Sequence, residues 1–257
     1  MYPFLKIGNL LLPMYGVCIA IGIVLALYLA VIDCQRKDLQ WEYMLAMASP
    51  GLLAGLIGAK LLYLLVTYTP HELLSVLKNG DVTGLIRGGF VFYGGFIAGI
   101  LVVVLMSKII KCNLSDYENT LVKCVPLAHA FGRIGCFFAG CCYGLPTESF
   151  LGVTFSNPLG SAPIGVPLMP VQLFESAFNL CLTALLWWID RRKPKSKMIL
   201  PLYLMLYATE RFVIEYFRFD AERGALLGFS TSQWISVAVF LVGIVILFYR
   251  KRKTAKC

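Results

Sequence analysis

The residues best suited to chemistry lie in the stretch 129–144, which reads HAFGRIGCFFAGCCYG. Its one charged residue, Arg133, is surrounded by apolar, glycine and cysteine residues in a chain that is hydrophobic throughout. An arginine at membrane depth costs about 3 kcal/mol or more, so such residues face the bundle interior and pair with an anion. We therefore expect Arg133 to face inward and to bind an anionic ligand or a carboxylate.

Several apolar runs carry polar residues at the spacing of one helix face. The stripes are His129, Arg133, Cys136 and Gly140; Gln172, Glu175 and Asn179; and Tyr207, Arg211, Glu215 and Arg218, while Tyr15 with Gly16, and Tyr93 with Gly94 and Gly95, begin two further runs. The topology derived below places all five groups at the outward-facing end of their runs. This pattern indicates a cavity that admits a polar headgroup from the outer leaflet.

The charges in these stripes allow two interpretations. In one, the site is made of buried ion pairs, with Glu175 opposite Arg133 and Glu215 opposite Arg211 and Arg218. In the other, the excess of guanidinium over carboxylate groups binds an anionic ligand such as a phosphate, for which forked arginine donors are suited.

Histidine and cysteine offer further reactive groups. A lone histidine in a membrane is commonly a hydrogen-bonded structural residue, but His129 lies one turn from Arg133 and is a candidate base. Cys136, Cys141 and Cys142 form a C-x4-C-C pattern, which is not a standard zinc spacing, so we predict no metal site. A Cys136–Cys141 or Cys141–Cys142 disulfide is an alternative on the oxidising side of the membrane.

Composition defines the elements that must position these residues. The chain has 257 residues, 59% of them hydrophobic, and a mean hydropathy of +0.77, above the roughly 45–50% apolar content of soluble domains. We predict an all-α polytopic membrane protein that forms a single domain over 1–257. Because the net charge of +9 is concentrated in short loops, it indicates membrane topology and not a nucleic-acid partner.

Seven apolar runs approach the length of a membrane span, about 20 residues. They cover 10–32, 44–68, 90–107, 117–139, 171–190, 198–217 and 231–249. Fourteen of the 23 basic residues then fall on one side of the membrane, which the positive-inside rule makes cytoplasmic. This arrangement predicts seven transmembrane helices with the N-terminus outside and the C-terminus in the cytoplasm.

The remaining loops, 69–89, 141–170 and 218–230, then face outward. The 141–170 loop is rich in glycine and proline, which is typical of an irregular, re-entrant or lid-like segment. Glycines in the second and third runs have spacings that allow close helix packing. They are Gly51, Gly55, Gly58, Gly95 and Gly99.

Together these motifs resemble the bacterial prolipoprotein diacylglyceryl transferase family. The matching blocks are MYG (14–16), VFYGGFIAG (91–99), GRIGCFFAGCCYG (132–144), MPVQLFES (169–176) and ERFVIEYFRFD (210–220), which occur in family order over nearly the whole chain. The resemblance implies a seven-span enzyme of the bacterial inner membrane. Such an enzyme moves the diacylglyceryl group of phosphatidylglycerol onto the lipobox cysteine of a prolipoprotein signal peptide.

The resemblance also implies roles for individual residues. Arg133 and Gly135 match the signature arginine and glycine, and Gly144 matches its closing glycine. Matches to other family blocks are Tyr15, Gln172, Glu175, Arg211, Glu215 and Arg218. The chain departs from the family at Tyr93, where a histidine is usual, at Cys136, where asparagine is usual, at Cys141 and Cys142, and at Met169. It is therefore similar to a cysteine-rich branch.

We predict that Arg133 and Arg211 stabilise the departing phosphate, and that His129 or Tyr93 removes the thiol proton. We assign substrate binding to Tyr15, Gly94, Gly95, Gly135, Cys136, Gly144, Gln172, Glu175, Glu215 and Arg218. The expected partners are phosphatidylglycerol, the lipobox peptide and membrane lipid, with no cofactor. Two alternatives are a related transferase for another thiol and a carrier of anionic lipid, although a carrier should show internal repeats, which we do not find.

Overall fold

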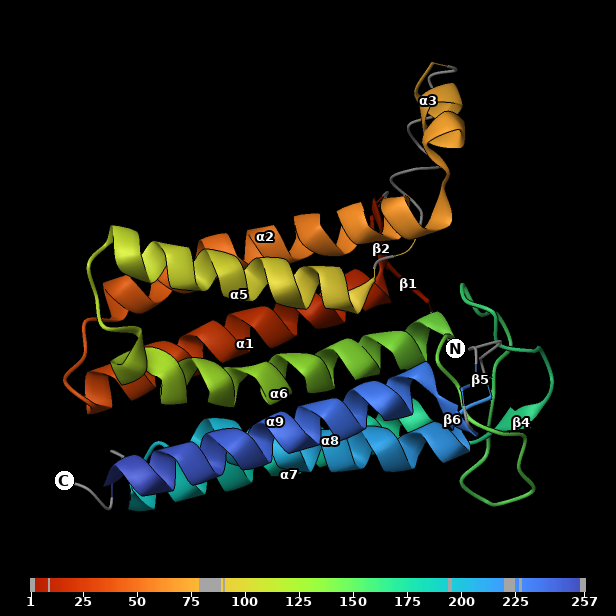
Figure 1. Ribbon diagram of the computed structural model, residues 1–257. Coiled ribbons are helices and arrows are strands. Elements are labelled where there is room, and N and C mark those ends of the chain that lie inside the picture. Colours follow the sequence, from red (N-terminus) through yellow and green to blue (C-terminus); the bar gives the residue numbers. More distant parts are fainter. Residues whose placement is uncertain are drawn as a thin grey trace. The chain divides into compact units, whose positions relative to one another are not determined.

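The computed structural model describes residues 3–8, 10–78, 89, 91–193, 196–219, 225–226 and 228–254 (Figure 1). Over these residues the chain is mostly helical and contains eight α-helices. They are α1 (Met14–Arg36), α2 (Trp41–Thr67), α3 (Pro70–Lys78), α5 (Phe92–Ile109), α6 (Leu114–Ala139), α7 (Val171–Arg192), α8 (Ile199–Ile214) and α9 (Thr231–Thr254). The chain divides into two compact units, Met1–Asp33 with Glu118–Cys257 and Cys34–Tyr117.

Helix α6 packs against α1 in the first unit, and α8 packs against both α7 and α9 (Figure 1). A side chain at Gly22 of α1 would lie 2.5 Å from the Cβ atom of Phe131, which shows how closely α1 and α6 approach. Buried Leu182 and Leu186 of α7 meet Ile199 and Tyr203 of α8 in an apolar cluster. The predicted polar stripes of α6, α7 and α8 thus belong to helices of one packed unit.

Short β-structure lies at one end of these helices. A hairpin of β1 (Phe4–Ile7) and β2 (Leu10–Pro13) precedes α1, β3 (Val153–Thr154) pairs with β4 (Pro167–Leu168), and β5 (Ala225–Leu226) pairs with β6 (Phe229–Ser230), all antiparallel. The 141–170 loop has a small core of its own, made of Tyr143, Phe155, Ala162 and Leu168. This segment is irregular, as predicted, but it is anchored by packing.

The second unit is built on the pairing of α2 with α5. A Cβ atom at Gly95 would lie 2.7 Å from the carbonyl oxygen of Gly55, and one at Gly58 would lie 2.5 Å from the Cβ atom of Ala98. Backbone approach this close requires glycine on both helices. The predicted packing role of these glycines is confirmed.

Each of the seven predicted runs coincides with one helix. Four helices are long and apolar enough to cross a membrane, namely Met14–Arg36, Trp41–Thr67, Leu114–Ala139 and Thr231–Arg252, and Tyr93–Ile109 is a shorter apolar helix. A polytopic membrane protein is therefore supported, while seven spans and their orientation stay predictions. The predicted helix start at residue 10 was wrong, because residues 10–13 form β2 and Pro13 disfavours helix before it.

The predicted outer loops differ in how far they can be compared with the structure. The 69–89 loop contains a helix, α3, which the sequence analysis did not predict. Residues 79–88 of that loop lie outside the described residues, as do residues 220–224 and 227 of the 218–230 loop.

Candidate functional site

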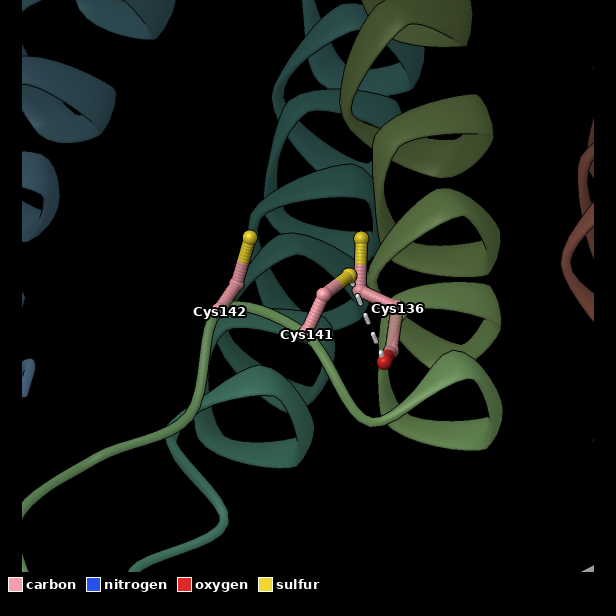
Figure 2. A group of neighbouring side chains, drawn as sticks. All are labelled: Cys136, Cys141 and Cys142. Atoms are coloured by element: carbon pink, nitrogen blue, oxygen red, sulfur yellow. Dashed lines mark hydrogen bonds between the residues drawn. The ribbon is translucent and has the colours of Figure 1, made fainter. Parts of the chain in front are cut away.

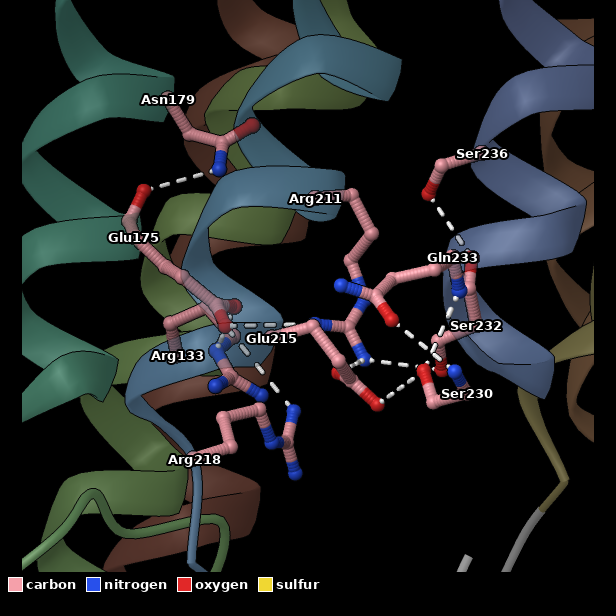
Figure 3. Close-up of polar contacts among 10 residues, drawn as sticks. All are labelled: Arg133, Glu175, Asn179, Arg211, Glu215, Arg218, Ser230, Ser232, Gln233 and Ser236. Carbon is pink, nitrogen blue, oxygen red and sulfur yellow. Dashed lines mark hydrogen bonds and ion pairs between the residues drawn. The ribbon is translucent and has the colours of Figure 1, made fainter. Parts of the chain in front are cut away.

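Three arginines from separate elements surround one carboxylate in the first unit (Figure 3). Glu175 on α7 forms an ion pair with Nε of Arg133 on α6. Its Oε1 atom lies 3.9 Å from Nη1 of Arg211 on α8 and 3.9 Å from Nη1 of Arg218. Arg133 and Glu175 are buried, so these charges interact away from solvent. The inward orientation predicted for Arg133 is confirmed.

Arg211 has two further partners at the end of α8. Its Nη2 atom lies 2.9 Å from Oε2 of Glu215 and donates a hydrogen bond of 3.2 Å to Oγ of Ser232. Glu215 in turn accepts a hydrogen bond of 2.9 Å from the hydroxyl of Ser230. Glu215 begins the 3₁₀ turn Glu215–Phe217, which follows α8 directly and keeps the carboxylate on the side of Arg211.

The start of α9, which contacts Arg211 and Glu215, is held by its own capping hydrogen bonds. Ser230 and Gln233 form a capping box, since the Ser230 amide donates to Oε1 of Gln233 at 2.9 Å and the Gln233 amide donates to the Ser230 hydroxyl at 3.2 Å. Ser230, Ser232 and Gln233 were not among the site residues predicted from the sequence. The Ser-x-x-Gln signal before an apolar run was available and would have located this helix start.

Two guanidinium donors in the cluster are left without an acceptor. Within the described part of the chain, Nη2 of Arg133 and Nη1 of Arg211 are buried and have no hydrogen-bond partner. The 3.9 Å separations from Oε1 of Glu175 are too long for hydrogen bonds, and this oxygen is likewise buried without a hydrogen-bond partner in that part of the chain. Buried donors are nearly always paired, so two such groups on neighbouring arginines indicate a site for an acceptor-rich anion.

The ion-pair interpretation of the charges is confirmed for two pairs, and the anion-binding interpretation stays a prediction. The Arg133–Glu175 and Arg211–Glu215 ion pairs exist as predicted. The ion-paired cluster nevertheless contains three guanidinium and two carboxylate groups, the third guanidinium being that of Arg218. Among these ion-paired groups one guanidinium is in excess, and Glu210, the residue before Arg211, adds a third carboxylate whose oxygens are buried without a hydrogen-bond partner among the described residues.

The glycines and Tyr15 of the first unit allow close approach around the site. A Cβ atom at Gly135 would lie 3.1 Å from the carbonyl oxygen of Tyr15, so the start of α1 packs directly on α6 there. Gly144 pairs with Arg218 in an isolated antiparallel bridge, and a Cβ atom on it would lie 2.7 Å from the Met169 carbonyl oxygen. These contacts place Tyr15 and Gly144 at the edges of the arginine cluster.

His129 lies one turn before Arg133 on α6. Its ring makes an edge-on contact with the ring of Tyr207, with centroids 5.5 Å apart. Tyr207 itself stacks on Tyr203 at 5.8 Å. His129 therefore has a packing partner in Tyr207, and its role as a base stays a prediction.

Three cysteines meet at the C-terminal end of α6 (Figure 2). The Sγ atoms of Cys136, Cys141 and Cys142 all lie within 4.8 Å of one another, and all three are free thiols, as are the other cysteines of the described chain. The side-chain amide of Gln172 donates a hydrogen bond of 2.7 Å to the carbonyl oxygen of Cys141. Neither of the two disulfides considered from the sequence is present.

Tyr93, Gly94 and Gly95 belong to the second unit, at the start of α5. There Gly94 and Gly95 face Gly58 and Gly55 of α2 and serve helix packing. Their predicted part in substrate binding, like that of Tyr93 in catalysis, stays a prediction. The other candidate residues all belong to the first unit.

The comparison with known families matches this arrangement. A family model described as prolipoprotein diacylglyceryl transferase matches residues 3–249. The chain belongs to the prolipoprotein diacylglyceryl transferase family.

Relatives within this family cover nearly the full chain. A phosphatidylglycerol–prolipoprotein diacylglyceryl transferase of Clostridium tetani is 35% identical over 232 residues, 90% of each chain. The enzyme numbered 2 of Clostridium perfringens is 35% identical over 254 residues, 98% of this chain and 96% of the relative. One from Dehalococcoides mccartyi is 28% identical, over 96% of this chain and 93% of the relative.

Two blocks by which the chain resembles this family meet in the arginine cluster. Arg133 and Arg211, assigned by resemblance to two different family blocks, lie in the structure beside the same carboxylate. Residues 78 positions apart in the chain therefore lie together in the structure.

Proposed function

We propose that the chain is a phosphatidylglycerol–prolipoprotein diacylglyceryl transferase. The observation that carries the proposal is the pair of buried, acceptor-less donors on Arg133 and Arg211 in a chain that belongs to this family over residues 3–249. The names of the relatives support this donor and acceptor over an anionic-lipid carrier or a different thiol.

In this reaction the lipobox thiol sulfur forms a bond to the primary carbon of the diacylglyceryl group. The bond from that carbon to the phosphate oxygen breaks, glycerol phosphate leaves with the electron pair, and the thiol proton passes to a base. Arg133 and Arg211 donate to the phosphate oxygens on which charge develops. Removal of one such buried donor typically slows a reaction about 10²- to 10³-fold.

Glu175 keeps the arginines in position for this task. Its carboxylate holds Arg133 through Nε, which leaves the terminal nitrogen Nη2 available to a ligand. Glu215 and Ser232 hold Arg211 in the same way through Nη2 and leave Nη1 available. A guanidinium group can do both at once because its donors form a rigid fork.

The proposal includes the membrane arrangement derived from the sequence: seven spans, an outer N-terminus and a cytoplasmic C-terminus in the bacterial plasma membrane, with 1–257 as a single domain. The cytoplasmic placement of Arg191 and Arg192 follows the positive-inside rule. The site would then open toward the outer leaflet. Cysteine labelling from the periplasmic side tests this, and equal labelling of a residue at each end of α7 would contradict it.

The activity is tested with purified chain, labelled phosphatidylglycerol and a lipobox peptide. Wild-type protein should produce a diacylglyceryl-modified peptide, and Arg133→Ala and Arg211→Ala should each lower the rate at least about 100-fold. Arg191→Ala, which changes an exposed arginine outside the site, is the control and should retain the wild-type rate. Full activity in both site variants would refute the phosphate role. A modified small thiol with an unmodified peptide would favour the other-thiol alternative.

The base is tested separately. His129→Gln keeps a hydrogen-bonding group of similar reach, so it should retain substantial rate if His129 is a scaffold residue. A large loss that is relieved as the pH rises would assign the proton transfer to His129. Tyr93→Phe tests the alternative base in the same assay.

A further inference from the structure

The three cysteines at the C-terminal end of α6 form a cluster that the arginine chemistry does not use. Cys136 lies in the last turn of the helix, and Cys141 and Cys142 follow it. Figure 2 shows the three sulfur atoms on the same side of this turn. All three residues are partly exposed.

The turn that carries them is fixed by its neighbours. Beyond the bond from Gln172, the amide of Gly144 donates to the carbonyl oxygen of Met169 at 3.0 Å, and the amide of Phe219 donates to that of Tyr143 at 3.2 Å. Cys142 has a φ of 58°, in the left-handed region that a non-glycine residue rarely adopts. Such a conformation persists only where its surroundings enforce it, and it is common at functional sites.

We propose that Cys136, Cys141 and Cys142 bind a zinc ion as three thiolates. Zinc bonds to sulfur at about 2.3 Å in tetrahedral geometry, which holds the sulfur atoms about 3.8 Å apart. The observed separations, all within 4.8 Å, need a closure of about 1 Å or less, which side-chain rotation provides. Three protein ligands leave the fourth position open, the arrangement of catalytic zinc sites.

The charge around the cluster fits this ion. Zinc with three thiolates carries one net negative charge, which favours a nearby cation. Arg133 lies three residues before Cys136, on the same face of α6. Arg218 pairs through its backbone with Gly144, two residues beyond Cys142. The cysteine cluster and the arginine cluster are therefore neighbours along both α6 and the segment after α8.

This inference deepens the proposed function and rests on it for the role of the open position. The lipobox thiol would bind there as the fourth ligand, and its proton would pass to solvent, since a thiol that coordinates zinc is deprotonated. Its sulfur would then form the bond to the glyceryl carbon as the carbon–oxygen bond to phosphate breaks. The ion would take over the proton removal for which His129 and Tyr93 are otherwise the candidates.

The proposal replaces the expectation of no metal. That expectation came from linear spacing, in which C-x4-C-C matches no standard zinc pattern. In the fold, where Cys142 has a left-handed conformation, the sulfur atoms of Cys141 and Cys142 lie on the same side as that of Cys136 (Figure 2).

The test is metal content and spectroscopy of the full chain purified in detergent. Wild-type protein should contain about one zinc per chain, and Co²⁺ added after zinc removal should give a sulfur-to-cobalt charge-transfer band. The Cys136→Ser and Cys141→Ser variants should contain at least tenfold less zinc per chain and should give a weaker cobalt band. Cys181→Ser, at an exposed cysteine of α7, should behave as wild type. A chelator applied to the wild-type protein should also remove the zinc, without any substitution.

The outcomes separate the inference from the proposed function. Zinc that is lost from the Cys136→Ser variant supports the site even if no chain transfers diacylglyceryl. Full transfer by metal-free wild-type protein would overturn the role of the ion in activating the lipobox thiol and leave the transferase proposal intact. Zinc retained in both cysteine variants, or Cys136 found in a disulfide in the active enzyme, would overturn the zinc site itself.

Discussion

Two clusters of buried charge lie on α6 about ten residues apart, or about 15 Å along the helix axis, and they differ in how completely they are paired. At one, Lys123 forms ion pairs with Asp190 on α7 and, at 2.7 Å, with Asp33 on α1, and none of the three side chains is exposed. Thr120 donates to Asp33 at 2.6 Å and Asn119 donates to Asp190 at 3.1 Å. At the other, around Arg133, buried donors lack acceptors.

The difference indicates separate purposes. The Lys123 cluster joins α1, α6 and α7 through charges whose partners are all supplied by the chain, so it serves to hold these helices in register. The arginine cluster is paired only as far as needed to orient its guanidinium groups. Burial of charge alone therefore does not mark a binding site, whereas incomplete pairing of that charge does.

Breaking the lysine cluster should have the largest effect on stability. Lys123→Met leaves Asp33 and Asp190 buried without their cation, which typically costs about 3–5 kcal/mol. The variant should unfold at a markedly lower denaturant concentration in detergent and accumulate poorly in membranes. Lys108→Met, at an exposed lysine near the end of α5, should change stability by less than about 0.5 kcal/mol. Equal stability of both variants would mean that the lysine cluster is not a structural junction.

An anionic headgroup should stabilise the arginine cluster and leave the lysine cluster unaffected. Phosphatidylglycerol added to zwitterionic micelles at about 100 times its Kd should raise the free energy of unfolding by about 2.7 kcal/mol. Arg133→Ala should abolish this gain because it removes an unused donor. Thermal unfolding with and without the lipid measures it. An equal gain in wild type and variant would place lipid binding elsewhere and remove the distinction between the clusters.

Neutralising Glu175 tests whether the arginine cluster also has a structural part. Glu175→Gln removes the carboxylate shared by three arginines, but Arg211 keeps Glu215 and Ser232. We therefore expect a stability loss of about 2 kcal/mol, smaller than for Lys123→Met. Turnover should fall roughly tenfold to a hundredfold because the guanidinium groups lose their alignment. Glu148→Gln, at an exposed position in the 141–170 loop, is the control.

A stability loss from Glu175→Gln as large as that from Lys123→Met would show that both clusters are structural. An unchanged turnover would show that Glu175 does not position the arginines. Either result would contradict the comparison drawn above.

The sequence predicted the helices and the arginine cluster because both depend on strong local signals. Long apolar runs fix the helices, and a charge in such a run must face inward, so Arg133 and Arg211 were found by their cost of burial. Glu175 was found as the carboxylate on a matching stripe. Lys123 carried the same signal but was left unassigned, because its partners Asp33 and Asp190 lie at the ends of other helices.

Other features depend on contacts between distant segments. Ser232 reaches Arg211 only because α9 packs against α8, and no spacing in the sequence shows that contact. The cysteine cluster depends on one backbone conformation, the positive φ of Cys142, which the residue type does not predict. The β2 strand replaced a predicted helix start because an apolar run of four residues fits both structures.

The smallest expected effect concerns Ser232, the point where α9 contacts the arginine cluster. Ser232→Ala removes one acceptor from Nη2 of Arg211, which keeps its ion pair with Glu215 at 2.9 Å. Loss of a single hydrogen bond of about 1 kcal/mol should lower kcat/KM about fivefold and leave the fold intact. Ser236→Ala, one turn further along α9, is the matched control, since its hydroxyl bonds to the Ser232 carbonyl oxygen within the helix. If both variants lose activity equally, the contribution of α9 is general packing and Arg211 is oriented by Glu215 alone.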